Sequence, residues 1–142
     1  MQVDNILQSK GMTVYTVRTH APISEAVRVL TEHRIGAVVV LADNGSVAGI
    51  LSERDVVRHL GGDPTTLLQR AVREIMTADV ITCERRTDIS ELMERMTNHR
   101  IRHIPVVEAG ELIGIVSIGD VVKRKIEEAE QEALALREYI SS

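Results

Sequence analysis

Residues 49–57 read GILSERDVV, and residues 114–122 read GIVSIGDVV. Upstream of these stretches, residues 31–40 read TEHRIGAVVV and residues 97–106 read TNHRIRHIPV. The same order of apolar, turn and polar residues therefore runs through the chain twice. A repeat of this length is one supersecondary unit that stacks on its copy, so we expect two similar halves with two related clefts between them.

Each copy is predicted to fold as strand, helix, strand, strand and helix. Apolar residues recur at helical spacing in the first helix, and the runs that follow are short and rich in β-branched residues, which favours buried strands. One unit cannot cover both faces of its small sheet, so two are expected to pack as one α/β (α+β) module with pseudo-twofold symmetry and a long C-terminal helix. The predicted divisions are repeat 1 at residues 3–63, repeat 2 at residues 72–126 and a helical extension at residues 127–142.

The link between the copies is predicted to hold a short helix within residues 67–76. Strands are expected at residues 14–17, 37–41 and 47–51 of the first copy, and near residue 80, at 104–107 and at 112–116 of the second.

The last helix is predicted to run beyond the repeat. Its apolar residues step by four and three, which is the 3.5-residue period of a coiled-coil seam. The apolar stripe either packs back on its own domain or serves self-association. The second interpretation is favoured because the helix extends beyond the repeat and an apolar stripe is expected to be buried against another surface. The seam comprises Val122, Ile126, Ala129, Ala133, Leu136 and Ile140.

Composition excludes several classes of protein. The net charge is −4, from 17 basic and 21 acidic residues, and the aromatic residues are two Tyr with no Phe or Trp. A nucleic-acid protein needs a basic surface or stacking aromatics, so nucleic acid is not an expected partner. The single cysteine, Cys83, fits a reducing compartment, and no apolar run has the length of a signal peptide or membrane span. We expect a cytoplasmic protein without a membrane partner.

A Ser-x-x-Asp sequence follows a predicted strand in each copy, as Ser52 with Asp55 and as Ser117 with Asp120. One interpretation is a ribose-phosphate site, because a Ser hydroxyl and free N–H groups at a helix start bind phosphate, and an Asp accepts hydrogen bonds from ribose hydroxyls. The other is a plain helix cap with an acidic residue in the first turn. The place of the motif in a duplicated strand–helix unit favours the binding site.

The combination of His-Arg-Ile before an apolar strand and Gly-Ile-(Leu/Val)-Ser-x-x-Asp-Val-Val after the next resembles a pair of CBS domains over about residues 3–126. The Ser-Glu-Arg-Asp variant and the long last helix are similar to small stand-alone bacterial CBS-pair proteins. The resemblance implies two β-α-β-β-α repeats in one module, dimerisation of modules into a flat disc, and clefts that bind adenine nucleotides. Adenine would be bound by backbone and apolar groups, ribose by Asp, and phosphate by Ser or Thr and nearby basic residues.

The resemblance also implies that each cleft draws on both copies. In one cleft it places Ser117, Ile118, Gly119 and Asp120 opposite Val14, Tyr15, Thr16, Ile35, Gly36 and Ala37. In the other it places Ser52, Glu53, Arg54 and Asp55 opposite Val80, Ile81, Thr82, Ile101, Arg102 and His103.

The second cleft is expected to be the more basic, because Arg54, Arg102 and His103 stand where the first has small neutral residues. The alternatives are a surface role for Arg102 and a half-buried structural role for His103.

These features predict a non-catalytic sensor that binds an adenine nucleotide (AMP, ADP, ATP or NAD), changes conformation, and acts as a homodimer on an unknown protein partner. The alternative is a structural or dimerisation module without a ligand, in which Ser-x-x-Asp serves only as a cap. An enzyme is disfavoured, because no nucleophile–base arrangement, metal-ligand spacing or glycine-rich phosphate loop occurs in the sequence. No catalytic residue, metal or catalytic cofactor is therefore expected.

Overall fold

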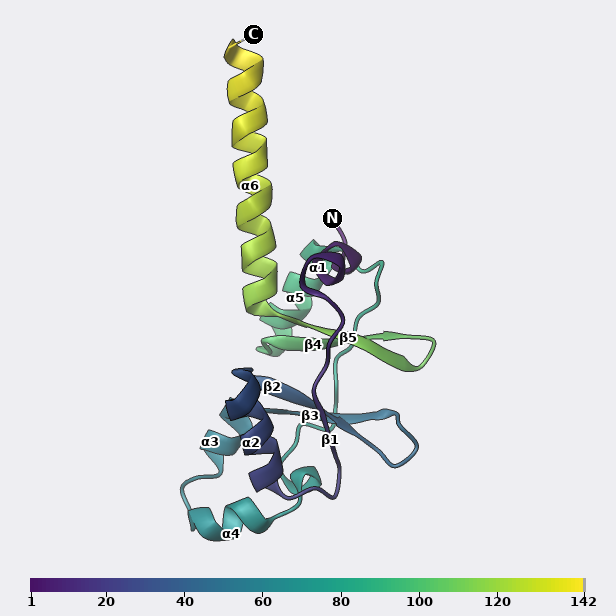
Figure 1. Cartoon of the computed structure of the whole chain (residues 1–142), viewed down its shortest axis with the longest axis vertical. Coiled ribbons are helices and arrows are strands. Elements are labelled where there is room, and N and C mark those ends of the chain that lie inside the picture. The colour runs from purple at the N-terminus through teal and green to yellow at the C-terminus, as the bar shows by residue number, and fades with distance from the viewer. Residues whose placement is uncertain (142) are drawn as a thin grey trace.

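The computed structural model describes residues 1–141 and shows two stacked halves with a long helix rising from one of them (Figure 1). In the first half, β1 (Thr16–Arg18) pairs parallel with β2 (Ala37–Leu41), which pairs antiparallel with β3 (Val47–Ser52). In the second half, β4 (His103–Glu108) and β5 (Glu111–Ser117) form an antiparallel hairpin. The helices are α1 (Val3–Lys10), α2 (Ile23–His33), α3 (Glu53–Arg58), α4 (Pro64–Gln69), α5 (Ile89–His99) and α6 (Ile118–Ser141).

The architecture confirms the predicted mixed α/β module of two related units, but two local predictions are wrong. The strand expected near residue 80 is reduced to a single parallel bridge between Cys83 and Val106. In the first half, the N–H of Val39 donates to the carbonyl of Tyr15 at 3.3 Å. Its counterpart in the second half is Pro105, which has no N–H to donate, so the ladder cannot continue there.

The link between the repeats also differs from the single helix predicted within residues 67–76. The structure has α4 followed by one 3-10 turn at Val72–Glu74. Helix α4 begins earlier than expected because Asp63 caps it, accepting from the N–H of Thr65 at 3.0 Å, and Pro64 occupies its first position.

The segment that precedes each repeat in sequence packs in the hydrophobic core of the other repeat. Helix α1 contributes Val3, Ile6 and Leu7 to the core of the second half, although it precedes the first repeat in sequence. The linking segment contributes Leu67, Val72 and Ile75 to the core of the first half. Each repeat is therefore completed by the segment that leads into the other.

A glycine marks the same contact in both cores. A Cβ built on Gly114 would lie 2.8 Å from Leu7 Cδ2, and one built on Gly49 would lie 2.6 Å from Met76 Sδ. These residues lack a side chain because the exchanged segment passes directly over the strand. Leu7 and Met76 therefore occupy equivalent places in the two halves.

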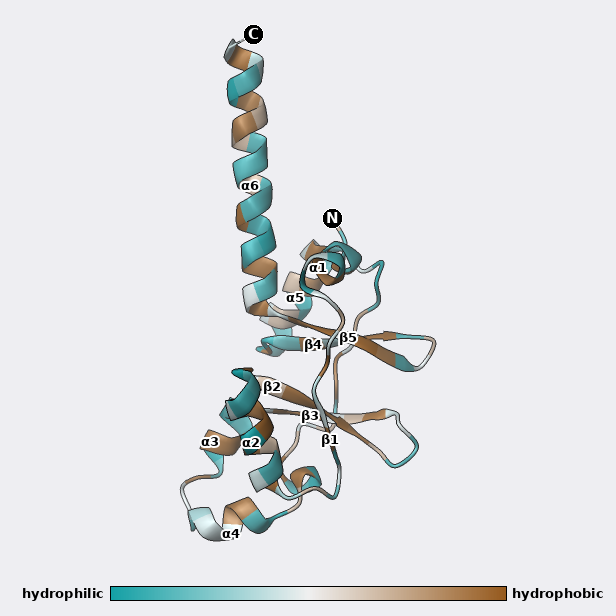
Figure 2. Ribbon diagram, viewed as in Figure 1, coloured by the Kyte–Doolittle hydropathy of each residue, from teal (hydrophilic) through white to brown (hydrophobic). Residues whose placement is uncertain are grey.

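Helix α6 leaves the body after its first turns and stands apart from it (Figure 1). Val121 is fully buried in the second core, whereas every described residue from 129 onward is exposed. Apolar and polar segments alternate along the projecting part (Figure 2). The interpretation that the stripe packs back on its own domain is wrong for this part of the helix.

We expect Gly49→Ala to lower the free energy of unfolding by about 1–3 kcal/mol. The added methyl would lie 2.8 Å from the carbonyl oxygen of Thr77, which belongs to the backbone and cannot rotate away. Denaturant unfolding followed by circular dichroism measures the loss.

Two further variants serve as comparisons. Gly114→Ala is expected to cost less, because the methyl meets the mobile end of Leu7, and Gly61→Ala is the control, because no atom lies within 4 Å of its Cβ position. Equal stability of Gly49→Ala and Gly61→Ala would contradict the tight packing of the exchanged segment.

Candidate functional site

The two predicted carboxylates lie at the starts of equivalent helices and form equivalent capping boxes. In the first half, Asp55 Oδ2 accepts from the N–H of Ser52 at 2.9 Å, and the N–H of Asp55 donates to Ser52 Oγ at 3.3 Å. In the second half, Asp120 Oδ2 accepts from the N–H of Ser117 at 2.9 Å, and the N–H of Asp120 donates to Ser117 Oγ at 3.2 Å. The cap geometry is thus present in both copies.

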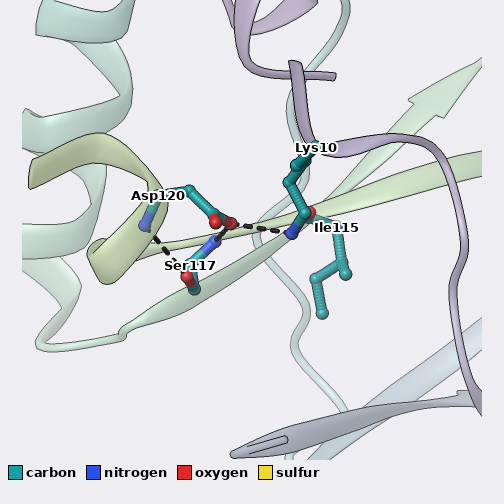
Figure 3. Close-up of polar contacts among 4 residues, drawn as sticks. All are labelled: Lys10, Ile115, Ser117 and Asp120. Carbon is teal, nitrogen blue, oxygen red and sulfur yellow. Dashed lines mark hydrogen bonds and ion pairs between the residues drawn. The ribbon is translucent and has the colours of Figure 1, made fainter. Parts of the chain in front are cut away.

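Asp120 has a further partner that the sequence did not indicate. Lys10, the last residue of α1, lies with its Nζ 2.7 Å from Asp120 Oδ2 and 2.9 Å from the carbonyl oxygen of Ile115 (Figure 3). Burial opposes ionisation of Asp120, but the hydrogen bonds from Lys10 and Ser117 outweigh it and lower the pKa of the carboxyl. Asp120 is therefore held as an ion-paired carboxylate.

Among residues 1–141, no cation pairs with the equivalent carboxylate, Asp55, in the first half. The carbonyl of Ile50, the counterpart of Ile115, accepts from the backbone N–H of Thr77 at 2.9 Å. Asp55 is buried, at 8% exposure, and the hydrogen-bond partner of its carboxylate in the described residues is Ser52. The two carboxylates therefore differ in charge environment although their caps match.

His103 lies where the two halves meet. A Cβ on Gly36 would be 3.1 Å from Cε1 and Nε2 of the His103 ring, so the ring packs against the backbone of the opposite repeat. Burial lowers the pKa of His103, the carboxylates of Asp120 and Glu53 oppose this shift, and Lys10 and Arg102 add to it. This half-buried ring lies within the electrostatic reach of both helix starts.

The positive charge predicted beside Asp55 is shared with the Asp120 side in the structure. His103 is close to the Asp120 side as well, and Lys10 adds a cation there. Arg54 and Arg102 are exposed. Of the two carboxylates, Asp120 is the one that contacts a cation within residues 1–141.

Backbone hydrogen bonds tie each loop after the HRI sequence to the nearby helix start. The N–H of Glu53 donates to the carbonyl of Gly36 at 2.9 Å, and the N–H of Ile118 donates to the carbonyl of Arg102 at 2.8 Å. Within each half, the structure thus joins two stretches that were assigned to opposite clefts. Ala37, the next residue after Gly36, is buried, and Ile35 and Ile101 pack against the two cores.

Two open hollows lie toward the hairpin turns. The first, of about 520 Å³, is lined by Val14 and Thr16 together with residues of both hairpins, including Leu112. The second, of about 720 Å³, is lined by Ile81, Thr82 and residues of α5. Neither lining includes Asp55 or Asp120, so the hollows hold one part of each predicted residue set and the carboxylates lie outside them.

Tyr15 lies between two lining residues but faces elsewhere. Its ring stacks on His33 with centroids 3.7 Å apart and an interplanar angle of 14°. Alternation along an extended chain explains why Val14 and Thr16 line the first hollow while Tyr15 does not. Val80, next to the second hollow, is half-buried, and Gly119 is exposed at the start of α6.

Other chemistry is limited in the described part of the chain. Burial raises the pKa of the Cys83 thiol to about 12, which disfavours a reactive thiolate. Within residues 1–141, no group of three or more His, Cys, Asp or Glu residues is arranged to hold a metal ion. The same residues contain no helix that is both long and apolar enough to span a bilayer.

The family model for the CBS domain matches residues 9–62 and 72–127. The chain therefore belongs to the CBS-domain family and carries a tandem pair, a class of regulatory modules.

Similar proteins have the same arrangement. A CBS-domain protein of known structure from Agrobacterium tumefaciens, ATU1752, is 45% identical with a TM-score of 0.83, and the match covers 87% of this chain and 92% of that one. The mitochondrial protein CBSX3 of Arabidopsis thaliana is 34% identical over 97% of this chain and 71% of its own length. The CBS pair of MJ0100, solved with 5′-methylthioadenosine and S-adenosyl-L-methionine, is 25% identical with a TM-score of 0.75, covering 87% of this chain and 98% of that one.

We expect the protein to lose stability as the pH falls from 7 toward 5.5, and His103→Asn to flatten this dependence. The pKa of folded His103 is lowered from about 6.5, so below that value the unfolded chain binds a proton that the folded chain does not. Stability is then greatest above about pH 6.5 and falls as the pH drops toward the folded pKa. Unfolding in urea at each pH measures the slope.

His20→Asn is the matched control, since the His20 side chain is 66% exposed. If His103→Asn kept the wild-type slope, burial of a neutral His103 ring would be contradicted.

Proposed function

We propose that this CBS pair is a non-catalytic sensor that binds an adenine nucleotide, AMP, ADP, ATP or NAD, between its repeats and acts on a protein partner. The observation that carries the proposal is the duplicated carboxylate at a helix start, with one oxygen left for a ligand. The CBS pair of MJ0100, which was solved with two adenosine-containing ligands, supports the ligand class.

The cap and the ligand use different oxygens of each carboxylate. The hydrogen bonds that the carboxylates of Asp55 and Asp120 accept within residues 1–141 all go to Oδ2. Oδ1 of each side chain is therefore the acceptor for a ribose hydroxyl, and hydrogen bonds to a charged acceptor contribute about 1.5–3 kcal/mol. Holding Oδ2 in the cap orients Oδ1 before the ligand arrives.

Lys10 favours the Asp120 side for a phosphorylated ligand. A nucleotide approaching a lone buried carboxylate meets repulsion between like charges, and the Lys10 ammonium at 2.7 Å offsets that charge. The chain as a whole is acidic, at −4, so local neutralisation matters. We therefore propose that Asp120 marks the preferred nucleotide cleft, with His103 beside it in the same half and Gly36 on the opposite wall.

Regulation would follow from a population shift. A ligand that touches both halves favours the setting of the repeats that it binds better, and a tenfold preference corresponds to about 1.4 kcal/mol. Asp120 lies in the first turn of α6, and the rest of this helix projects from the body (Figure 1). A shift of the first turn on ligand binding would therefore move the projecting part of the helix. We propose that the module works as a homodimer in the cytoplasm, where a reduced Cys83 is stable.

The capping boxes support a second candidate function. If Asp55 and Asp120 serve only as caps, the protein is a structural or dimerisation module, and α6 is its functional surface. The observed bonds between Ser52 and Asp55 and between Ser117 and Asp120 are those that this alternative requires.

We expect Asp120→Asn to weaken binding of AMP or ATP by at least about tenfold, since one charge-assisted hydrogen bond is lost. Asn retains a carbonyl oxygen for the cap, so the melting temperature without ligand should fall only by the small contribution of the lost ion pair with Lys10. Isothermal titration calorimetry with AMP, ATP and NAD measures the affinity. Denaturing the freshly purified protein and identifying the released small molecules by mass spectrometry gives the natural ligand.

Asp63→Asn is the matched control, because Asp63 also caps a helix, as the N-cap residue of α4, where the N–H of Thr65 donates to its carboxylate. If no nucleotide binds the wild type and Asp120→Asn only lowers the melting temperature, the structural alternative replaces the sensor.

We expect Lys10→Gln to reduce the affinity for AMP about tenfold while changing the affinity for adenosine much less, because the ammonium offsets charge that only the phosphate brings. Raising the salt concentration should weaken AMP binding to the wild type more than to the variant.

Arg28→Gln removes one positive charge from an exposed position on α2 and serves as the control. An equal loss of affinity for AMP and adenosine in Lys10→Gln would contradict the assigned role.

A further inference from the structure

We propose that α6 pairs with α6 of a second copy as a parallel, in-register two-stranded coiled coil. The inference rests on the proposed homodimer and specifies which surface joins the copies and in which orientation.

The seam of α6 is exposed along its whole length. Val122 is 48% exposed, Ile126 53%, Leu136 60% and Ile140 75%. Val121, one position away from the start of the seam, is fully buried in the second core. The helix therefore has two apolar faces at its base, one for its own body and one turned to solvent, and a second helix can approach the latter without displacing the body.

The seam has the residue types of a two-stranded coiled coil. Its a positions are Ile126, Ala133 and Ile140, and its d positions are Val122, Ala129 and Leu136. In parallel coiled coils, branched Ile at a with Leu at d favours two strands over three or four, and Ile126, Ile140 and Leu136 follow this pattern. The two Ala in the centre allow the helices to approach closely, while the larger residues fill both ends.

The flanking charges select a parallel orientation. In a parallel pair, each g residue faces the e residue of the next heptad on the partner helix. Lys125 at g then faces the partner's Glu130 at e, and Glu132 at g faces the partner's Arg137 at e. Both contacts are attractive, and twofold symmetry repeats each of them.

An antiparallel pair of full overlap brings like charges together. It aligns a positions with d positions, so e residues face e residues and g residues face g residues. Glu130 then faces the partner's Glu130, and Glu132 faces the partner's Glu132. Lys123 faces the partner's Arg137 at the ends. Such contacts oppose this orientation, which is how coiled coils choose between partners and orientations.

The ion pairs that these residues make within α6 do not prevent the pairing. Lys125 Nζ lies 3.9 Å from Glu128 Oε2, a long contact between partly exposed groups. Exposed pairs of this kind contribute little, so Lys125 can turn to Glu130 of the partner subunit. Asp120 lies in the first turn of the same helix. The proposed nucleotide cleft of each subunit therefore lies at the base of the paired helices.

Disulfide trapping in the full-length chain tests the orientation. In the parallel pair, Ala129 faces the partner's Ala129, so Ala129→Cys should form a disulfide-linked dimer under mild oxidation. Gln131→Cys, on the outer face of the helix, is the control and should stay unlinked. Native Cys83 is buried and should not interfere. If Ala129→Cys links only when mixed with Ala133→Cys, the pair is antiparallel and the proposal is wrong.

Charge exchange tests the contacts themselves, with light scattering and sedimentation measuring the dimer. Glu130→Lys should raise the dissociation constant of the dimer about tenfold or more, and Lys125→Glu combined with Glu130→Lys should restore it. Glu138→Lys, the same change at an outer position, should leave it unchanged. A wild-type dimer that Glu130→Lys leaves intact would overturn the α6 pairing and keep the homodimer, whereas a wild-type monomer at tens of micromolar would overturn both.

Discussion

The exchange of leading segments between the two repeats is the contact on which the rest of the structure depends. Helix α1 supplies Leu7 to the second core, and the linking segment supplies Val72 to the first. Because apolar segments lose free energy when they return to water, neither half keeps a complete core without the other. The two halves are therefore held together, and a ligand bound between them, as proposed, would adjust their relative setting.

The same exchange makes the two helix starts unequal. The carbonyl of Ile115 is reached by the side chain of Lys10, whereas that of Ile50 is reached by the backbone of Thr77. One consequence is an ion pair on Asp120 that Asp55 lacks. The two halves have similar backbones because of the pseudo-symmetry. The segment that completes each half, α1 or the linking segment, decides which charges lie beside its carboxylate.

Helix α6 connects the site to the outside of the molecule. Its first turn holds the Asp120 cap, its next residues bury Val121 in the second core, and its remainder is exposed. The Asp120 carboxylate would contact the ligand and also belongs to the cap at the start of α6. A ligand-binding group is thereby joined to a rigid helix. Under the proposed function, this geometry would let a bound molecule act on the projecting helix.

The sequence by itself determined the duplicated units, the fold class and the matching positions of Asp55 and Asp120, because repeats, periodicity and caps are properties of neighbouring residues. It also contained the reason for the missing strand, since Pro105 lacks an N–H, although the consequence required knowing which residue it faces. The tertiary structure alone decided that Lys10 reaches Asp120, 110 residues away, and that His103 packs against Gly36. Those contacts depend on which half each leading segment completes, and no local pattern encodes that choice.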